Sequence, residues 1–365
     1  MNREYIILNG IEYDKNNIDL LASNSLSWQN EIYFFLRCWF DKKDSTTLRT
    51  SGSTGVPKKI DLAKELMRNS ARATNDFFGL DTTKTALLCL PASYIAGKMM
   101  IIRAMMGGCN LISVEPSSNP FEHIQNAIDF TALTPYQLQH SLESLKKIEV
   151  KHIIVGGGEI NLALAEKIDT LPSTVFETYG MTETASHIAL RQLNGNSKSS
   201  YFETLQGIYV NQDKRNCLTI KAPRLFDGIM KTNDMVEIIS DNKFRWLGRA
   251  DNIINSGGIK ILPEQIERKI AGCVSEKYFI SSLPDDFLGQ QVILVIESEK
   301  YPLPKETALK TNLKNLLQKY EIPKNIFFLP KFRYSSTYKI LKKDTLREIE
   351  SNLKSNSSYK PKSIV

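Results

Sequence analysis

One short run of small and hydroxyl-bearing residues carries the sharpest chemical signal in the sequence. Between Leu48 and Lys59 it supplies two glycines, four hydroxyls and a lysine, namely Thr50, Ser51, Gly52, Ser53, Thr54, Gly55 and Lys58. Glycines let successive backbone N–H groups turn toward one point, and the hydroxyls and the ammonium add donors. The run predicts a loop that binds a polyphosphate, with a plain surface turn as the alternative. Its spacing, Gly-x-x-Gly-x-x-Lys, excludes a Walker loop.

Further blocks rich in glycine, acidic and hydroxyl residues follow along the chain. In order they are Gly156-Gly-Gly-Glu159, Tyr179-Gly-Met-Thr-Glu183, Thr232-Asn-Asp234, the run 248–267 and the run 335–343. Together with the first run they resemble the signatures of the acyl-adenylate-forming superfamily of acyl-CoA synthetases, firefly luciferase and peptide-synthetase adenylation domains. The resemblance implies a ligase that uses ATP, Mg²⁺ and, as co-substrate, coenzyme A.

The resemblance also assigns roles at the triphosphate. Residues 50–58 would hold the β- and γ-phosphates, Tyr179 would stack on adenine, and Thr182 would donate to the α-phosphate. Glu183 would ligate Mg²⁺, a hard ion that prefers carboxylate and phosphate oxygen. Because the acid and ATP are both negative, catalysis should consist of positioning and charge stabilisation.

Four more residues belong to the implied nucleotide site. Gly157 and Gly158 follow an apolar strand, so backbone without side chains could approach the base. Asp234 would accept hydrogen bonds from both ribose hydroxyls, and Arg249 would reach the ribose or a phosphate. For Asp234 and Arg249 a surface ion pair is the alternative.

The C-terminal blocks imply a moving part. Asp251 falls at the family's hinge position, and Gly257-Gly258 would line the pantetheine tunnel because backbone without Cβ admits a thin ligand. Lys339 is the expected catalytic residue, whose ammonium would bridge the attacking carboxylate and the α-phosphate. A surface lysine is the alternative for Lys339, and its neighbours Lys342 and Lys343 are expected to be solvated.

The chain departs from the family pattern at several places. Lys59, Asn233 and Tyr338 stand where the family usually has glycine. The first signature begins at Thr50, whereas such enzymes usually place it more than a hundred residues into the chain. The resemblance therefore implies an N-terminally shortened version of the fold.

Two segments of the sequence restrict the identity of the acid substrate. Residues 130–139 and 182–189 resemble the o-succinylbenzoate–CoA ligases of menaquinone biosynthesis, and residues 90–103 match the substrate wall. The substrate of that family keeps a second, ring-borne carboxylate that needs a cationic or hydrogen-bonding partner. The expected contacts are Tyr94, Lys98, Thr184 and Ser186. Lys98 is the expected cation, with a rim position that reaches solvent as the alternative.

Three functions follow from these observations. The first is synthesis of o-succinylbenzoyl-CoA through an acyl-AMP. The second is activation of another acyl or aryl acid, or transfer to the phosphopantetheine of a carrier protein. The third belongs to a different class, a non-catalytic nucleotide-binding protein, suggested by the short N-terminal part and Tyr338.

Composition restricts compartment and partners. Five scattered cysteines, no secretory signal and no continuous apolar stretch of about 20 residues predict a cytoplasmic protein without a membrane-inserted segment. The histidines form no metal pair, so no transition metal is expected. The net charge is +7, and residues 300–365 hold 15 basic and 5 acidic residues. These basic residues alternate with Leu and Ile at helical spacing, which favours a solvated helix face over nucleic acid. A homodimer is left open.

The elements that position these residues form two domains of an α/β protein. Buried strands at 86–90, 111–114 and 152–155 alternate with helices at 28–40, 60–78, 120–127, 135–147 and 161–168, which predicts doubly wound mixed sheets. Strands at 218–221, 235–239 and 243–246 predict an antiparallel meander or barrel. A small α+β unit follows, with helices at 263–270 and 305–320. We therefore expect an ATP- and acid-binding domain over 1–250 and a mobile domain with the catalytic lysine over 251–365.

Overall fold

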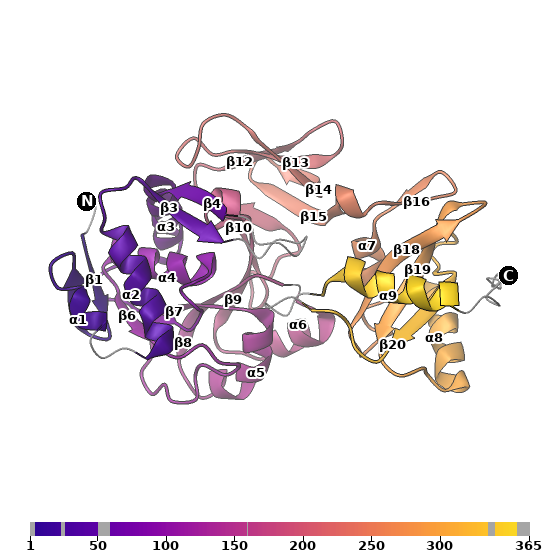
Figure 1. Ribbon diagram of the computed structural model, residues 1–365, viewed down its shortest axis with the longest axis horizontal. Coiled ribbons are helices and arrows are strands. Elements are labelled where there is room, and N and C mark those ends of the chain that lie inside the picture. Colours follow the sequence, from indigo (N-terminus) through magenta and orange to yellow (C-terminus); the bar gives the residue numbers. More distant parts are fainter. Residues whose placement is uncertain (1–3, 23–25, 50–58, 159, 335–339, 356–365) are drawn as a thin grey trace.

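Three β-sheets, of 13, five and two strands, and the helices around them make up the part of the chain that the structure describes (Figure 1). The computed structural model describes residues 4–22, 26–49, 59–158, 160–334 and 340–355. Predictions that fall on residues 50–58, Glu159, Tyr338 and Lys339 therefore lie outside the described residues. We call the part that ends at Arg249 the first lobe and the part from Ile254 onward the second lobe.

The first lobe is built on a 13-stranded sheet of order β12-β13-β14-β15-β11-β10-β9-β8-β7-β5-β6-β1-β2. Its parallel half comprises β1 (Tyr5–Leu8), β5 (Thr85–Leu88), β6 (Asn110–Ser113), β7 (Ile128–Leu133), β8 (Val150–Val155) and β9 (Thr174–Gly180). At one edge β2 (Ile11–Asp14) runs antiparallel to β1. The strands predicted at 86–90, 111–114 and 152–155 are confirmed.

Helices cover both faces of this parallel half, as the alternation along the chain predicted. They are α1 (Asp19–Ala22), α2 (Ser27–Trp39), α3 (Lys64–Phe78), α4 (Ile95–Gly107), α5 (Pro135–Leu145) and α6 (Leu162–Ile168). Neighbouring residues of one strand face different cores. Ile154 packs with the cluster that holds α2, α3 and α4, whereas Ile153 packs with the cluster that holds α5 and α6. Such alternation is the signature of a doubly wound sheet.

Two of the predicted helices differ from the structure. Residues 60–63 lie in β4 (Lys59–Ala63), which pairs antiparallel with β3 (Ser45–Arg49), so the predicted phosphate loop joins two strands and not a strand and a helix. Residues 120–123 form a turn and residues 124–127 are irregular. The Phe121 side chain is buried at 1 % exposure, and its N–H donates to Asn119 Oδ1. Local apolar spacing predicted a helix at both places. The structure has instead a strand paired with β3 at residues 60–63 and a turn with a buried phenylalanine at Phe121.

The antiparallel half of the large sheet confirms the predicted meander. It contains β10 (His187–Gln192), β11 (Phe202–Thr204), β12 (Tyr209–Gln212), β13 (Cys217–Lys221), β14 (Met230–Ser240) and β15 (Lys243–Arg249). In the register of β14 and β15, Asp234 lies opposite Arg249. Two functional candidates that are 15 positions apart in the sequence are therefore neighbours.

The second lobe has its own five-stranded sheet. It consists of β16 (Ile254–Ser256), β17 (Ile259–Ile261), β18 (Tyr278–Asp285), β19 (Gly289–Glu297) and β20 (Asn325–Leu329), with the helices α7 (Pro263–Lys269), α8 (Leu303–Leu316) and α9 (Lys342–Ser355). Separate apolar clusters lie on the two sides of β19. The change of sheet falls between Arg249 and Ile254. Mobility of the second lobe stays a prediction.

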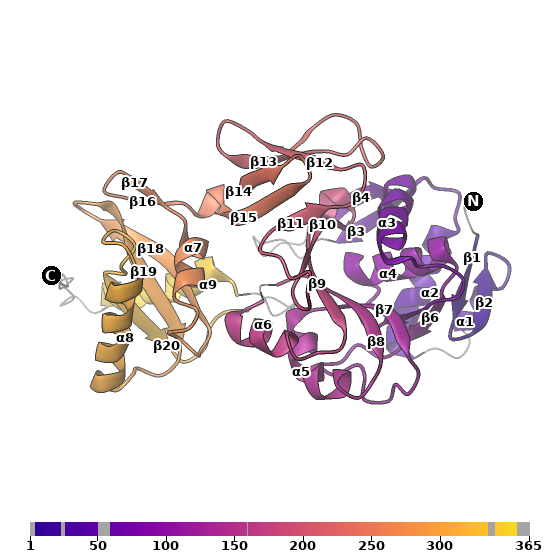
Figure 2. The ribbon, with the colours of Figure 1, turned by 180° about the vertical axis from the view of Figure 1, so that it is seen from behind.

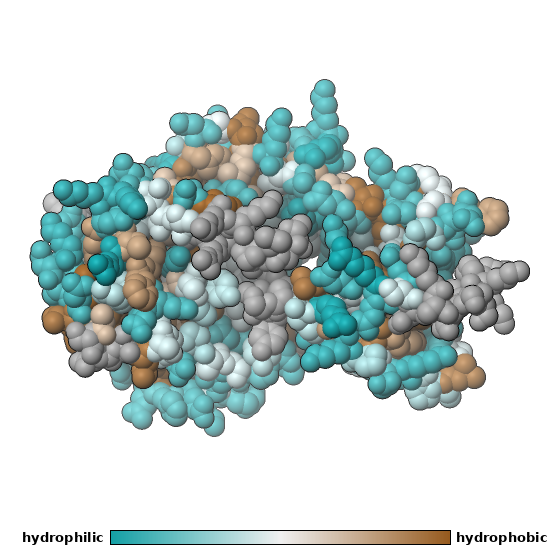
Figure 3. All heavy atoms as spheres, viewed as in Figure 1, coloured by the Kyte–Doolittle hydropathy of each residue, from teal (hydrophilic) through white to brown (hydrophobic). Residues whose placement is uncertain are grey.

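A membrane-spanning helix needs both sufficient length and sufficient hydropathy. None of the helices among the described residues is both long and apolar enough to cross a bilayer. On the face seen in Figure 1, hydrophilic residues predominate and apolar ones are scattered (Figure 3).

Lys342 begins α9, within the predicted block 335–343. Its side chain is 37 % exposed, but its ammonium has a charged partner that the sequence did not reveal. Its Nζ donates to Glu267 Oε1 at 2.9 Å and lies 5.5 Å from the centroid of the Phe279 ring. The Glu267 side chain is only 8 % exposed, and Oε1 also accepts from the N–H of Ile280 at 2.7 Å. Lys342 therefore fixes the start of α9 against α7 and β18.

Lys342→Met should lower the free energy of unfolding by about 1–3 kcal/mol, because the buried carboxylate of Glu267 loses its charged partner. The midpoint of urea unfolding measures this loss. Lys343→Met is the matched control, since the Lys343 side chain is exposed, and its effect should stay within about 0.5 kcal/mol. Equal effects of the two substitutions would contradict the structural role of Lys342.

Candidate active site

The glycine block and the tyrosine block meet at the carboxyl ends of two parallel strands. Gly156 follows β8, Tyr179 is near the end of β9, and Thr178 Oγ1 donates to the carbonyl of Val155 at 3.1 Å. A Cβ on Gly156 would lie 2.4 Å from Thr178 Oγ1, so only glycine fits there. The next residue, Gly157, has φ +83° with open space beside it. Ligands of open α/β sheets bind at such an edge.

Tyr179 connects this edge to the predicted ribose-binding carboxylate. Its hydroxyl donates to Asp234 Oδ2 at 2.9 Å, and its ring packs edge-on against Phe244, with centroids 5.0 Å apart. Burial and then the charge of Asp234 raise the pKa of Tyr179, so the hydroxyl remains a donor. The tyrosine is thus held at one end by its ring and at the other by its hydroxyl.

Asp234 is buried at 9 % exposure and receives donors from several sides. Trp246 Nε1 donates to Oδ1 at 3.2 Å, and Arg249 Nη1 lies 3.5 Å from the same oxygen. These contacts hold the carboxylate in a fixed orientation, and a carboxylate can accept hydrogen bonds from both hydroxyls of a diol. The structure therefore brings together Tyr179, Asp234 and Arg249, as the sequence predicted, and it adds Trp246, which the sequence analysis missed.

Arg249 also reaches the predicted hinge. Its Nη2 donates to Asp251 Oδ2 at 2.8 Å, and Asn233 Nδ2 donates to the same oxygen at 3.3 Å. Asn233 Oδ1 in turn accepts from Arg215 Nη1 at 3.0 Å. The asparagine that replaces the family's glycine thus links Asp251, at the start of the connection to the second lobe, to Arg215 in the first.

The segment after Tyr179 is a tight turn. A Cβ on Gly180 would lie 2.4 Å from the carbonyl oxygen of Ser186, and Ala185 adopts φ +60°, a strain of about 1 kcal/mol or more. Thr184 is fully buried, and its hydroxyl bonds the backbone of Met181 and Ser186. The predicted substrate contact at Thr184 therefore shapes the turn and does not present its hydroxyl to a ligand.

The same turn carries the predicted α-phosphate and magnesium residues. Thr182 and Glu183 begin a short 3₁₀ helix, Thr182–Thr184. The Glu183 side chain is exposed, and among the described residues it has no ion-pair partner. No group of three or more His, Cys, Asp or Glu side chains that could hold a metal occurs in the described ranges.

A buried arginine lies beside this turn, and the sequence analysis did not select it. Arg103 on α4 is 2 % exposed, and its Nη2 donates to Ser186 Oγ and approaches His187 Nδ1 at 3.4 Å. Its Nε has no hydrogen-bond partner, and no described carboxylate forms an ion pair with it. Burial lowers its pKa to about 9, which leaves it cationic at neutral pH. The available signal was a single cation inside the apolar run 99–106.

Lys98, the expected cation, points elsewhere. Its Nζ lies 5.5 Å from the centroid of the Phe35 ring on α2, and burial lowers its pKa while Cys38 and Glu31 oppose the shift. The structure thus brings Ser186 together with Arg103, and it directs Lys98 toward α2. Tyr94 precedes α4 and is 37 % exposed.

The predicted tunnel glycines lie apart from this site. Gly257 and Gly258, with φ +59° and +82°, form the turn of the β16–β17 hairpin. Both ribbon views place this hairpin in the second lobe, away from β9 (Figures 1 and 2). The structure does not bring these glycines to the nucleotide residues.

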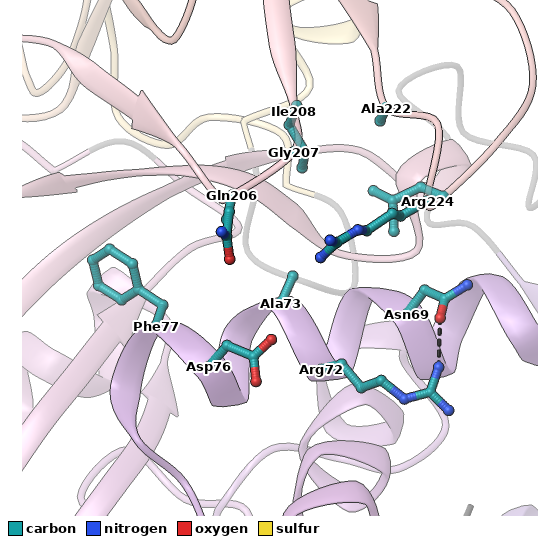
Figure 4. Close-up of a pocket in the computed structure, with 11 residues that line it drawn as sticks. Asn69, Arg72, Ala73, Asp76, Phe77, Gln206, Gly207, Ile208, Ala222 and Arg224 are labelled. Carbon is teal, nitrogen blue, oxygen red and sulfur yellow. Dashed lines mark hydrogen bonds between the residues drawn. The ribbon is translucent and has the colours of Figure 1, made fainter. Parts of the chain in front are cut away.

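A separate cavity of about 200 Å³ lies between α3 and the turn before β12 (Figure 4). Arg72, Asp76 and Phe77 line it from α3, and Gln206 and Arg224 face them. None of the predicted nucleotide or substrate residues lines this cavity, so the candidate site is the edge around Tyr179 and not this hollow.

Comparison with known proteins agrees with the geometry. The AMP-binding enzyme family matches residues 42–209. A 2-succinylbenzoate–CoA ligase from Lactococcus lactis is 25 % identical over 324 residues, which is 83 % of this chain and 71 % of that protein. An o-succinylbenzoate coenzyme A synthetase from Bacillus subtilis, solved with ATP and magnesium, is 22 % identical with a TM-score of 0.69, over 82 % and 69 % of the two chains.

A further solved structure is more similar in sequence and in length. It is an acyl-CoA synthetase (AMP-forming)/AMP-acid ligase II-like protein from Dyadobacter fermentans, 36 % identical with a TM-score of 0.61, and the alignment covers 92 % of this chain and 98 % of that one. The fold expected from the sequence is thereby confirmed. This chain belongs to the adenylate-forming family of AMP-binding enzymes, the AMP-forming acid–CoA ligases.

Proposed function

We propose that this enzyme converts o-succinylbenzoate to o-succinylbenzoyl-CoA, a step of menaquinone biosynthesis, in the cytoplasm. In the first half-reaction a carboxylate oxygen attacks the α-phosphorus of ATP and releases pyrophosphate. In the second, the thiol of CoA attacks the acyl-AMP, and AMP and a proton leave. The observation that carries the choice of acid is the buried guanidinium of Arg103, together with relatives that are named for this substrate.

The nucleotide would bind along the edge formed by Tyr179 and Asp234. The Asp234 carboxylate already has donors from Tyr179 and Trp246, and its remaining lone pairs can accept the ribose hydroxyls. Arg249 adds a positive charge 3.5 Å from Asp234 Oδ1. The exposed Glu183 fits a Mg²⁺ ion that takes most of its oxygens from phosphate and water, and the ion would neutralise charge on the triphosphate.

The acid would bind against the turn at Ser186. A buried guanidinium without a carboxylate partner is costly, and an anionic ligand removes that cost. A dicarboxylic acid supplies one carboxylate for adenylation and a second one for Arg103. Arginine binds carboxylates through charge-assisted hydrogen bonds, and its Nε–H lacks a partner among the described residues. This pairing favours o-succinylbenzoate over acids with a single carboxylate.

The second lobe would deliver Lys339, which lies outside the described residues. On either side of the segment 335–339, Tyr334 and Ile340 form an antiparallel bridge, and Lys342 is anchored to Glu267. These contacts fix the residues on either side of the segment. We propose that, when the second lobe is oriented for adenylation, the ammonium of Lys339 reaches the α-phosphate.

A screen of carboxylic acids for pyrophosphate release should show strongest turnover with o-succinylbenzoate in the presence of ATP and Mg²⁺. Free CoA should then yield the thioester. Turnover with another acid only, or transfer to a carrier protein but not to CoA, would replace the proposed substrate or acceptor. Absence of turnover with every acid, despite ATP binding, would favour a non-catalytic nucleotide-binding protein.

Arg103→Met should raise KM for o-succinylbenzoate by about 100-fold, since the ring-borne carboxylate loses a charge-assisted partner. KM for the same acid without the ring carboxylate should change by less than about 3-fold, because that acid makes no such contact. Lys98→Met, on the same helix, is the matched variant. A large effect of Lys98→Met with none of Arg103→Met would restore the sequence-based choice of Lys98.

Lys339→Ala should abolish formation of acyl-AMP, because the ammonium that offsets charge at the α-phosphate is removed. Thioester formation from supplied acyl-AMP and CoA should remain largely intact. Single-turnover assays of the two half-reactions separate these steps. Equal loss in both assays would remove Lys339 from the adenylation step.

A further inference from the structure

His187 occupies the buried space between Arg103 and α3. It is 5 % exposed and is the first residue of β10, directly after Ser186. Its Nδ1 lies 3.4 Å from Arg103 Nη2 and 3.4 Å from Ser186 Oγ, and its Nε2 lies 3.2 Å from Thr74 Oγ1. Both ring nitrogens therefore face a polar partner in the interior of the first lobe.

The identity of these partners fixes the position of the ring proton. A guanidinium can only donate, so Nδ1 must accept from Arg103. The proton of the neutral ring then resides on Nε2, which donates to Thr74 Oγ1. The Thr74 hydroxyl can accept this bond because its own proton goes to the carbonyl oxygen of Ser70 at 3.2 Å. A directional chain thus runs from Arg103 and His187 through Thr74 to the backbone of α3.

The charge state agrees with this chain. Burial and then the positive charge of Arg103 hold the pKa of His187 well below its usual value. A neutral ring presents a lone pair to the guanidinium, whereas an imidazolium would repel it. Burial of the ring at 5 % exposure also keeps water from replacing it as the acceptor.

We infer that His187 is a positioning residue that selects dicarboxylic acids by aiming the Arg103 guanidinium. Together with Ser186 it engages the Nη2 corner of Arg103 and leaves the Nε–H without a partner. The group that touches the second carboxylate is Arg103, and His187 acts only through it. This inference rests on the proposed function, since it presupposes an acid with a second carboxylate.

The test compares two substitutions at His187. Asparagine can place its side-chain oxygen near the position of Nδ1 and keep an acceptor for Arg103, whereas leucine fills the space without one. His187→Leu should raise KM for o-succinylbenzoate by about 10-fold or more, and His187→Asn by less than about 3-fold. KM for ATP and for the acid without the ring carboxylate should stay within about 2-fold of the wild-type values in both variants. A general packing defect would instead change these two KM values as well.

The Arg103→Met background separates this inference from the proposed function. If Arg103→Met raises KM for o-succinylbenzoate and His187→Leu adds nothing further to it, the two residues act as one unit. An effect of Arg103→Met combined with a silent His187→Leu overturns the role of His187 but leaves the proposed substrate. A silent Arg103→Met overturns the proposed substrate itself.

Nitrogen NMR of the ¹⁵N-histidine-labelled wild-type protein gives a readout that needs no variant at the site. The His187 signal should report a neutral ring with the proton on Nε2 at pH 7. A proton on Nδ1, or on both nitrogens, would show that the ring does not accept from Arg103 and would overturn the inference.

Discussion

The hydrogen bond between Tyr179 and Asp234 joins the two halves of the large sheet. Tyr179 is near the end of β9 in the parallel half, whereas Asp234 belongs to β14 in the antiparallel half. Four strands, β10 to β13, lie between β9 and β14 in chain order. The sheet has to bend for these two side chains to meet at 2.9 Å. Two further members of the candidate nucleotide site are positioned relative to this contact: Gly156 by the pairing of β8 with β9, and Arg249 by the register of β14 with β15.

Sequence patterns correctly predicted the strands and helices whose buried residues follow a regular local spacing. The strands of the parallel half are short apolar runs, and the predicted helix at 135–147 is confirmed as α5, whose start the structure shows to be a capping box formed by Thr134 and Gln137. The patterns failed where a distant partner decides. Residues 60–63 could continue the following helix, but they pair with the backbone of β3, 12 to 18 positions upstream. The local sequence around Lys342 predicts a solvated helix residue, because its partner Glu267 is 75 positions away in the chain.

The choice between Lys98 and Arg103 illustrates a similar limit within one helix. Both cations interrupt an apolar run on α4, so composition gives them equal weight. Five residues of an α-helix correspond to a rotation of about 140°, so the two side chains leave the helix in different directions. Lys98 points to α2, whereas Arg103 points to the start of β10 and contacts Ser186 and His187 there. The sequence could assign the wall of the acid-binding site to this helix. Which face of α4 forms that wall depends on how the helix packs, and the sequence pattern does not reveal it.

Arg249 connects the nucleotide residues to the second lobe. It is the last residue of β15 and lies between Asp234 and Asp251. The same strand contacts α7, because Arg268 donates to the carbonyl of Leu247 and its guanidinium lies 5.7 Å from the centroid of the Trp246 ring. Trp246 in turn donates to Asp234. If the second lobe turns about Asp251, as the family resemblance implies, the contacts of Arg249 and Trp246 must change together. A nucleotide whose ribose engages Asp234 would then favour one lobe arrangement over the other, because the same carboxylate contacts Trp246, which packs against Arg268 of the second lobe, and Arg249, which is bonded to Asp251.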